Sequence, residues 1–275
     1  MRKERIDVLL VEQGLVATRE QAKRLVMAGV VYCGTEVMDK PGTKISVDAC
    51  LFVKGALHPF VSRGGVKLAH ALEVFDVSLK DHVVIDVGAS TGGFTDCALQ
   101  NGAAHVYAVD VGYGQLAWSL RSDPRVTVME RLNFRHVLPT AFPIRPTAGV
   151  MDVSFISIHK LLPKLHDVLV PDASVICLVK PQFEAGPSAV GKGGIVRDPR
   201  VHEEVLYRAV SSATEDGFCV QALVASPIRG GEGNVEFLLW LKSNIGPSLV
   251  SQEQIREIVA LTHDNFQRNG VAKSL

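Results

Sequence analysis

A run of valine and isoleucine leads directly into a glycine-rich turn and then into a helical stretch, and this transition limits the possible folds most. The run is Val83-Val84-Ile85, and the turn after it, residues 86–94, contains three glycines. Continuous apolar runs between helical stretches are typical of strands that are buried on both faces of a mainly parallel sheet. The sequence therefore predicts an α/β domain whose ligands bind beyond the carboxyl ends of the strands.

The alternation of apolar runs and helical periodicity continues toward the C-terminus. The predicted strands cover residues 83–87, 105–109, 126–129, 148–152, 174–179, 218–225 and 235–241. The predicted helices cover residues 65–75, 93–101, 115–121, 156–169, 202–216 and 252–268. This order predicts a Rossmann-like domain with a mainly parallel, seven-stranded sheet and helices on both faces.

The composition excludes several other classes of protein. Lysine and arginine number 29, as do aspartate and glutamate, so net charge by itself does not indicate a nucleic-acid-binding protein. No window contains the ~18 or more consecutive apolar residues of a membrane-spanning helix. The five cysteines form no C-x-x-C pair, which favours reduced thiols in a cytoplasmic protein over a disulfide framework or a zinc site. We expect no bound metal.

The first 55 residues follow a different pattern, which indicates two short helices followed by small hairpins. Thr18-Arg19-Glu20-Gln21 has the form of a capping box, in which two side chains satisfy backbone N–H groups at the start of a helix. Arg19, Lys23 and Arg24 then fall on one exposed side of that helix. Such a side is in most proteins only a solvated surface, so this spacing alone does not establish a nucleic-acid contact.

This segment resembles the small α-L RNA-binding domain of a small-subunit ribosomal protein, of pseudouridine synthases and of tyrosyl-tRNA synthetases. The resemblance rests on Arg5-Ile6-Asp7-x-x-Leu10, on the spacing of apolar residues and glycine over 18–31, and on the Lys40-Pro41 turn. It implies that the basic side of the second helix contacts RNA. With two cations of the α/β domain added, the predicted RNA-binding residues are Arg5, Arg19, Lys23, Arg24, Arg63 and Lys192.

The boundary between the two patterns lies where periodicity disappears and glycine and proline appear. We expect an α+β RNA-binding domain over residues 1–55, a linker over 56–61 and the α/β domain over 62–275. Lys192 lies in a glycine-rich loop, residues 186–194, which is either a substrate-side loop or an idle surface loop.

Three kinds of site are compatible with the glycine-rich turn. A dinucleotide-binding turn has the pattern G-x-G-x-x-G, but Ser90 occupies the position of the glycine that lets a pyrophosphate approach the backbone. Residues 88–92 match the nucleophile elbow G-x-S-x-G of hydrolases. However, only one helix fits between the linker and Asp86, which leaves no room for the preceding strands and oxyanion loop of a hydrolase.

The third kind of site binds S-adenosylmethionine, which has no phosphate. We expect the helix N-terminus after the turn to stabilise the cofactor's carboxylate, and Asp110 to accept both ribose hydroxyls. Glu130 ends the third strand, near which an adenine would lie. Acidic residues end strands in many α/β proteins, but their joint spacing here favours cofactor binding. The predicted cofactor-binding residues are Asp86, Gly88, Ala89, Ser90, Gly92, Gly93, Phe94, Asp110, Val111, Glu130 and Asp152.

The residues after the fourth and fifth strands indicate the methyl acceptor. Amine methylases usually carry N-P-P-Y or D-P-P-Y after the fourth strand, whereas residues 152–155 read Asp-Val-Ser-Phe, so a base nitrogen is a less favoured acceptor. Lys180 follows the fifth strand, where a lysine commonly only reaches solvent. Lys67 and Glu236, at the ends of two other predicted elements, favour a lysine-rich active site instead.

The whole chain resembles the TlyA, or hemolysin-A-like, ribosomal RNA 2′-O-methyltransferases, which are relatives of the FtsJ-type enzymes. The resemblance is most specific over residues 61–68, 86–95, 109–116, 152–157, 179–184 and 233–236. It implies S-adenosylmethionine as cofactor and cytidine riboses of 16S or 23S rRNA, within 30S or 50S subunits, as targets. It also implies a K-D-K-E catalytic tetrad, which is formed by Lys67, Asp152, Lys180 and Glu236.

The tetrad suits this chemistry. A ribose 2′-hydroxyl is a weak nucleophile, so its proton has to be removed or polarised while it attacks a sulfonium methyl group. We assign Lys180 as the general base, and we expect Lys67, Asp152 and Glu236 to orient it and the hydroxyl.

Two other functions are compatible with the sequence. The family's older name implies a membrane-active hemolysin, but the chain lacks a spanning helix and a strongly amphipathic cationic stretch with tryptophan anchors. A non-catalytic RNA-binding assembly factor would retain the fold without turnover, although no tetrad residue is missing. We expect a monomer or a weak homodimer.

Overall fold

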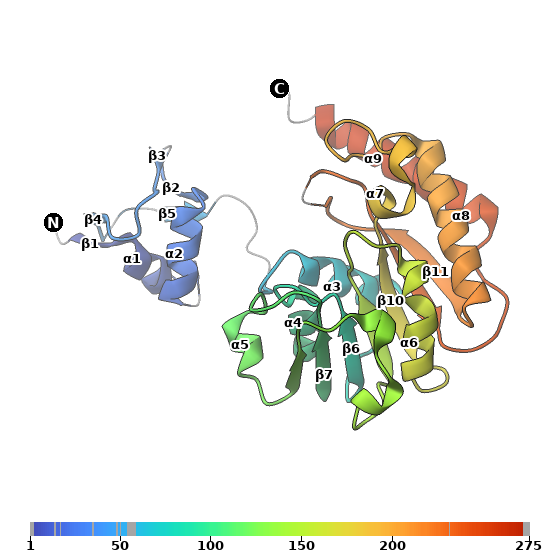
Figure 1. Ribbon diagram of the computed structural model, residues 1–275. Coiled ribbons are helices and arrows are strands. Elements are labelled where there is room, and N and C mark those ends of the chain that lie inside the picture. Colours follow the sequence, from blue (N-terminus) through green and yellow to red (C-terminus); the bar gives the residue numbers. More distant parts are fainter. Residues whose placement is uncertain are drawn as a thin grey trace. The chain divides into compact units, whose positions relative to one another are not determined.

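The structure is a computed structural model of the 275-residue chain, and it describes residues 3–13, 15–16, 18–34, 36–47, 49, 51–53, 59–230 and 232–271. By its internal contacts the chain separates into two compact units, residues 1–58 and residues 59–275. In Figure 1 the first unit is blue and the second runs from cyan to red. Residues 56–58 of the predicted linker lie outside the described residues.

The N-terminal unit packs two helices against short antiparallel strands. Its elements are β1 (Lys3–Arg5), α1 (Ile6–Glu12), α2 (Arg19–Met27), β2 (Val31–Cys33), β3 (Glu36–Val37), β4 (Lys44–Ser46) and β5 (Leu51–Val53). The Thr18 hydroxyl accepts a hydrogen bond from the Gln21 backbone N–H at 3.2 Å, so the predicted N-terminal cap of α2 is confirmed. Leu9 of α1 and Val26 of α2 are buried in one apolar cluster, which joins the two helices. The pairing of β1 with β4 was not predicted, because β1 has no alternation of apolar residues.

The second unit is built on a seven-stranded sheet with the order β11-β12-β10-β9-β6-β7-β8. Its strands are β6 (Val83–Val87), β7 (His105–Val109), β8 (Val126–Met129), β9 (Ala148–Met151), β10 (Ser174–Val179), β11 (Cys219–Ala225) and β12 (Phe237–Lys242). β12 is antiparallel to both of its neighbours, and the other neighbouring strands pair in parallel. The predicted mainly parallel sheet is therefore confirmed.

Helices cover both faces of this sheet (Figure 1). They are α3 (Gly64–Val74), α4 (Gly93–Gln100), α5 (Trp118–Arg121), α6 (Leu162–Val168), α7 (Pro181–Glu184), α8 (Pro199–Glu215) and α9 (Gln252–Val271), with 3₁₀ helices at Phe134–His136, Pro139–Ala141, Ile158–Lys160 and Pro187–Ala189. Residues of α3, α4 and α5 share one buried apolar cluster, and residues of α6, α8 and α9 share another. Alternate strand residues enter the two clusters, so the sheet is the middle of three layers. No helix in the described ranges has the length and apolar character needed to cross a bilayer.

Two predicted helices are shorter than expected. The one predicted over 156–169 is divided into a 3₁₀ turn and α6, because Pro163 has no backbone N–H to bond to the preceding turn and therefore stands at a helix start. The one predicted over 115–121 is only α5, since the Ala117 N–H bonds to the carbonyl of Thr91 at 3.0 Å. β12 begins two residues later than the predicted strand 235–241.

Candidate active site

The glycine-rich turn after β6 brings two strand ends into close contact. Gly88 has a φ of +87°, which disfavours any side chain, and a Cβ atom added there would lie 2.7 Å from the carbonyl oxygen of Asp152. Asp152 follows β9, which is the neighbour of β6 in the sheet. Glycine at position 88 therefore permits the convergence of the two strand ends on which the site is built.

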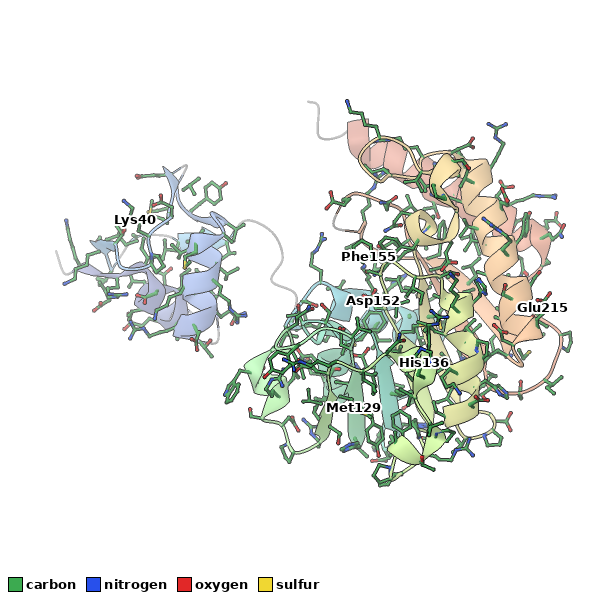
Figure 2. The ribbon with its side chains drawn as sticks, viewed as in Figure 1. Lys40, Met129, His136, Asp152, Phe155 and Glu215 are labelled. Atoms are coloured by element: carbon green, nitrogen blue, oxygen red, sulfur yellow. The ribbon has the colours of Figure 1, made fainter. Side chains whose placement is uncertain are left out.

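A cavity of about 420 Å³ opens at this edge of the sheet. This volume is typical of cofactor sites. Of the predicted cofactor-binding residues, those that line it are Gly88, Ser90, Asp110, Val111 and Asp152. Leu132, Asn133 and Phe134, in the loop after β8, also line it and were not predicted. Another groove, of about 540 Å³, follows α8 as far as Glu215 (labelled in Figure 2) and contains none of the predicted site residues.

Asp110 is held at the edge of the cavity by two backbone groups. The N–H of Ser90 donates to Oδ2 at 2.7 Å, and the N–H of Gly112 donates to Oδ1 at 2.6 Å. A carboxylate offers about four lone pairs, so each oxygen retains acceptor capacity. A carboxylate fixed in this way suits a pair of ribose hydroxyls.

Asp86 is fully buried beneath the turn. The Thr95 hydroxyl donates to its Oδ2 at 2.6 Å, whereas Oδ1 has no hydrogen-bond partner among the described residues. Burial is the main cause that raises the pKa of Asp86 to about 7, and the negative charges of Asp152 and Asp110 add to this effect. The two acidic side chains that line the cavity, Asp110 and Asp152, favour a cationic ligand over a phosphate-bearing one.

Gly92, Gly93 and Phe94, also predicted to bind the cofactor, are buried behind the turn. A Cβ atom at Gly93 would lie 2.9 Å from the backbone nitrogen of Gly65. Gly93 thus permits the close approach of α4 to α3, whereas a Cβ atom at Gly92 would meet the side chains of Leu116 and Leu120. None of the three residues is among those that line the cavity.

Ala89 and Glu130 line a smaller hollow, which shares Ser90 and Asp110 with the main cavity. Glu130 accepts hydrogen bonds from Arg121 at 2.5 Å and from the backbone N–H of Gly114 at 2.9 Å. Its pKa is lowered, first of all by the Arg121 hydrogen bond. Protein groups thus already engage the carboxylate that was expected to lie near an adenine.

The four predicted catalytic residues form two ion pairs. Lys67 Nζ donates to Glu236 Oε2 at 2.5 Å, and both side chains are buried. Lys180 Nζ lies 2.6 Å from Asp152 Oδ1 and donates a hydrogen bond to the Ser154 hydroxyl at 2.9 Å. Ser154 was not predicted, because a serine after a strand has no distinctive pattern.

The strand register explains why both pairs lie at the same edge. Val179, the last residue of β10, pairs with Phe237, the first residue of β12, so the lysine after one strand and the glutamate before the other are neighbours. Asp152 reaches this edge because β9 runs parallel to β10. Its Oδ2 lies 3.7 Å from the Cβ position of Gly64, the first residue of α3. The sheet edge and the start of α3 therefore bring the four side chains together.

An exposed aromatic ring stands beside the second ion pair. Phe155 is 91% exposed, has a φ of +64°, and packs against Phe183 with a ring-centroid distance of 5.0 Å. Figure 2 shows Phe155 close to Asp152. Phe155 is also among the residues that line the cavity, and a positive φ at a residue other than glycine is strained, as is often seen at functional sites. Phe155 was not predicted, because most aromatic residues after strands belong to the core.

The side chain of Asn234 connects two loops near Glu236. Its Oδ1 accepts from the Val196 N–H, and its Nδ2 donates to the Gly194 carbonyl, each at 2.9 Å. Because Asn234 is buried, these bonds tie the glycine-rich loop that carries Lys192 to the segment before β12.

Most of the predicted RNA-binding residues are at the surface. The exposed ones are Arg19, Lys23, Arg24, Arg63 and Lys192. Arg5 is partly buried, since its guanidinium bonds to the buried carboxylate of Asp7.

Family models match most of the chain. The model described as FtsJ-like methyltransferase matches residues 60–243, and the S4 domain model matches residues 4–49. The chain belongs to the FtsJ-like methyltransferase family. As a member of this family it is a methyltransferase with S-adenosylmethionine as its cofactor, and it carries an N-terminal S4 domain.

Relatives in this family extend over nearly the whole chain. TlyA of Mycobacterium tuberculosis, named 16S/23S rRNA (cytidine-2′-O)-methyltransferase, is 45% identical over 90% of this chain and 93% of its own. YqxC of Bacillus subtilis, provisionally named an rRNA methyltransferase, is 54% identical over 97% of this chain and 96% of its own. A solved Streptococcus thermophilus structure, provisionally described as a hemolysin, is 50% identical with a TM-score of 0.78, and the match covers 98% of this chain and 99% of that one.

Proposed function

We propose that the protein transfers a methyl group from S-adenosylmethionine to the 2′-hydroxyl of a cytidine ribose in 16S or 23S rRNA. The observation that carries the proposal is the placement of the Lys180–Asp152 pair at the cofactor cavity, with the Lys67–Glu236 pair at the same sheet edge. The similarity to TlyA supports the choice of substrate.

The cavity suits this cofactor in charge and in hydrogen bonding. Asp110 would accept from the ribose hydroxyls, and the unpartnered Oδ1 of Asp86 fits a donor such as the α-ammonium group. The bound cofactor supplies an electrophilic methyl group on a sulfonium centre. The pyrophosphate of a dinucleotide would instead face the carboxylates of Asp110 and Asp152, which is unfavourable.

Lys180 serves as the general base in this proposal. Asp152 and Ser154 hold its Nζ at 2.6 Å and 2.9 Å, so the nitrogen has a fixed position beside the cavity. In its neutral form this nitrogen takes the hydroxyl proton as the ribose oxygen attacks, a contribution typically worth about 10²- to 10⁴-fold in rate. Lys67 and Glu236 fix each other's positions through their ion pair, and the ribose lies against this pair.

Phe155 holds the target base. We expect the target nucleotide to leave the helical stack when its ribose reaches this edge, and the exposed ring then offers its base a new stacking surface. Stacking of a base on an aromatic side chain contributes about 1–3 kcal/mol. We therefore expect Phe155→Ala to raise the KM for the RNA more than it lowers kcat.

The two parts of the chain divide the work. Residues 1–55 bind rRNA, and residues 56–61 connect them to residues 62–275, which bind the cofactor and catalyse the methyl transfer. The S4 match over residues 4–49 supports the RNA-binding role of the first part. We place the enzyme in the cytoplasm, where it acts on 30S or 50S subunits as a monomer or weak homodimer.

The test is tritium transfer from labelled S-adenosylmethionine to purified 30S and 50S subunits, followed by nuclease digestion to locate the label. We expect label in 2′-O-methylcytidine with the wild type and at least about 100-fold less with Lys180→Ala. Calorimetry should show that this variant still binds the cofactor. Cofactor binding by the wild type without transfer to either subunit would overturn the proposal and favour a non-catalytic assembly factor.

The hemolysin alternative has its own test. Purified cofactor-free protein is added to erythrocytes, and the release of haemoglobin is measured. We expect no lysis, and lysis at submicromolar protein would favour the alternative.

A further inference from the structure

Two arginines of the N-terminal unit share one buried carboxylate. Arg5 donates to Asp7 from Nε to Oδ1 at 2.9 Å and from Nη2 to Oδ2 at 3.0 Å. Arg19, the first residue of α2, donates from Nη2 to the same Oδ2 at 3.1 Å. The Asp7 side chain is fully buried, whereas those of Arg5 and Arg19 are 39% and 56% exposed. A buried anion thus holds two cations at the surface.

The shared oxygen sets the spacing of the two guanidinium groups. Because both Nη2 atoms bond to Oδ2, their separation cannot exceed the sum of the two bond lengths, about 6 Å. Charge-assisted bonds to phosphate are about 2.8 Å long, so a single phosphate group can contact both nitrogens. Asp7 accepts from two of the five N–H groups of Arg5 and from one of the five of Arg19.

The backbone fixes Arg5 as well. The Ile6 N–H bonds to the Thr43 carbonyl at 3.0 Å, and Arg5 pairs with Lys44 across β1 and β4. A Cβ atom at Gly42 would lie 3.4 Å from Arg5 Nη1, so the guanidinium lies close against this turn. A side chain held in this way loses little freedom when it binds a ligand.

We propose that Asp7 is a positioning residue, which holds Arg5 and Arg19 as a clamp for a single RNA phosphate. The inference rests on the proposed RNA-binding role of residues 1–55. By Coulomb's law alone a carboxylate in this place weakens the attraction for RNA. Its benefit is that it keeps two like-charged groups close together in the geometry that the phosphate requires. The positive end of the α2 dipole, next to Arg19, favours an anion at the same place.

The charge of Asp7 and its positioning of the two arginines act on RNA affinity in opposite directions, and this difference can be tested. The measured quantity is the affinity of the full-length protein for purified 30S and 50S subunits. Asp7→Asn removes a negative charge, so attraction alone predicts tighter binding, whereas the clamp predicts binding weaker by about 5- to 10-fold. The matched control is Glu20→Gln, which removes the same charge from an exposed residue in the first turn of α2. We expect this control to bind as tightly as the wild type or more tightly.

A second variant covers the case in which Asp7→Asn unfolds the unit, which circular dichroism would detect. Arg19→Lys keeps the charge and leaves Arg5 bonded to Asp7, but it loses the planar donor geometry. We expect several-fold weaker binding, whereas Arg200→Lys, at an 88% exposed side chain of α8, should have no effect. Unchanged affinity for Arg19→Lys, or tighter binding by a folded Asp7→Asn protein, would overturn the clamp. If the wild type binds neither subunit, the proposed function itself fails.

Discussion

Lys67 Nζ and Glu236 Oε2 are 2.5 Å apart, although 169 positions separate the two residues in the sequence. Lys67 lies in α3, the first helix of the second unit, and Glu236 directly precedes β12. The pair therefore connects the beginning of this unit with its last strand. A buried ion pair adds little net stability, but the loss of one partner leaves the other charge buried and unpaired.

The first prediction concerns this pair. We expect Glu236→Gln to lower the free energy of unfolding by about 3–5 kcal/mol, because the Lys67 ammonium then remains buried without an anion. Lys67→Met should have a similar effect. The double variant should recover most of the loss, since no charge is left unpaired, and urea unfolding of the four proteins measures this coupling. Strictly additive losses would contradict the prediction.

A second prediction separates the charge of Lys180 from its ability to accept a proton. Lys180→Arg keeps a cation beside Asp152, but a guanidinium does not lose its proton at neutral pH. We expect this variant to lose as much kcat as Lys180→Ala, about 10²- to 10⁴-fold. Ser154→Ala removes one hydrogen bond to Nζ and should cost only about 5- to 10-fold. Single-turnover transfer measures both effects, and an active Lys180→Arg enzyme would exclude the base role.

A third prediction follows from the burial of Asp86. Because its pKa is raised to about 7 in the folded state, the stability from this group is fully present below pH ~4 and is lost as the pH rises through 7. The loss amounts to up to about 4 kcal/mol. We expect the melting temperature of the cofactor-free protein to fall less between pH 4 and 8 in the Asp86→Asn variant than in the wild type. If the melting temperatures of the two proteins change equally with pH, Asp86 does not titrate in this range.

A fourth prediction concerns two histidines that join α8 and α9. His202 is fully buried, and its Nδ1 lies 2.8 Å from His263 Nε2. Burial, followed by the neighbouring His263, lowers the pKa of His202 to about 4. A lowered histidine pKa contributes stability above pH ~6.5 that is lost as the pH falls through 4, here up to about 3 kcal/mol. The contribution of His202 to stability thus grows as the pH rises, whereas that of Asp86 falls.

His202→Asn keeps a polar atom near the position of Nδ1 and cannot take up the proton. We expect it to be less stable than the wild type at pH 7 but to lose less stability between pH 6.5 and 4. His136→Asn, a change at an exposed histidine labelled in Figure 2, is the matched control and should follow the wild-type curve. The prediction is wrong if His202→Asn also follows it.

The sheet could be predicted from the sequence because its signals are local. Runs such as Val83-Val84-Ile85 are typical of strands buried on both faces, and the turn at Gly88 requires a residue without a side chain. β1 could not be predicted in this way. Its charged residues acquire a strand conformation only through pairing with β4, about forty residues later, and no local pattern encodes that partner.

The site could be predicted only where residues have distinctive chemistry. Lys180 and Asp152 could be chosen as candidates because charged residues at strand ends are few, and the strand order brings the two side chains together. Leu132 and Phe134 line the cavity as ordinary apolar residues, so nothing in their identity separates them from the core. The burial of Asp86 could not be predicted either, since a carboxylate near the end of a strand can point either toward a ligand or beneath the turn.

The position of β12 in the sheet also has a consequence for synthesis of the chain. β12 lies between β10 and β11, yet it is the last of the seven strands to leave the ribosome. Until then β10 is an open edge of buried apolar residues, and such edges invite pairing with other chains. Lys67 also has no counter-charge until Glu236 is made. The nascent enzyme therefore has an exposed apolar strand edge from the completion of β10 until β12 is made, and this edge favours aggregation. A chain released before residue 236 would lack both the strand that pairs with β10 and the counter-charge of Lys67.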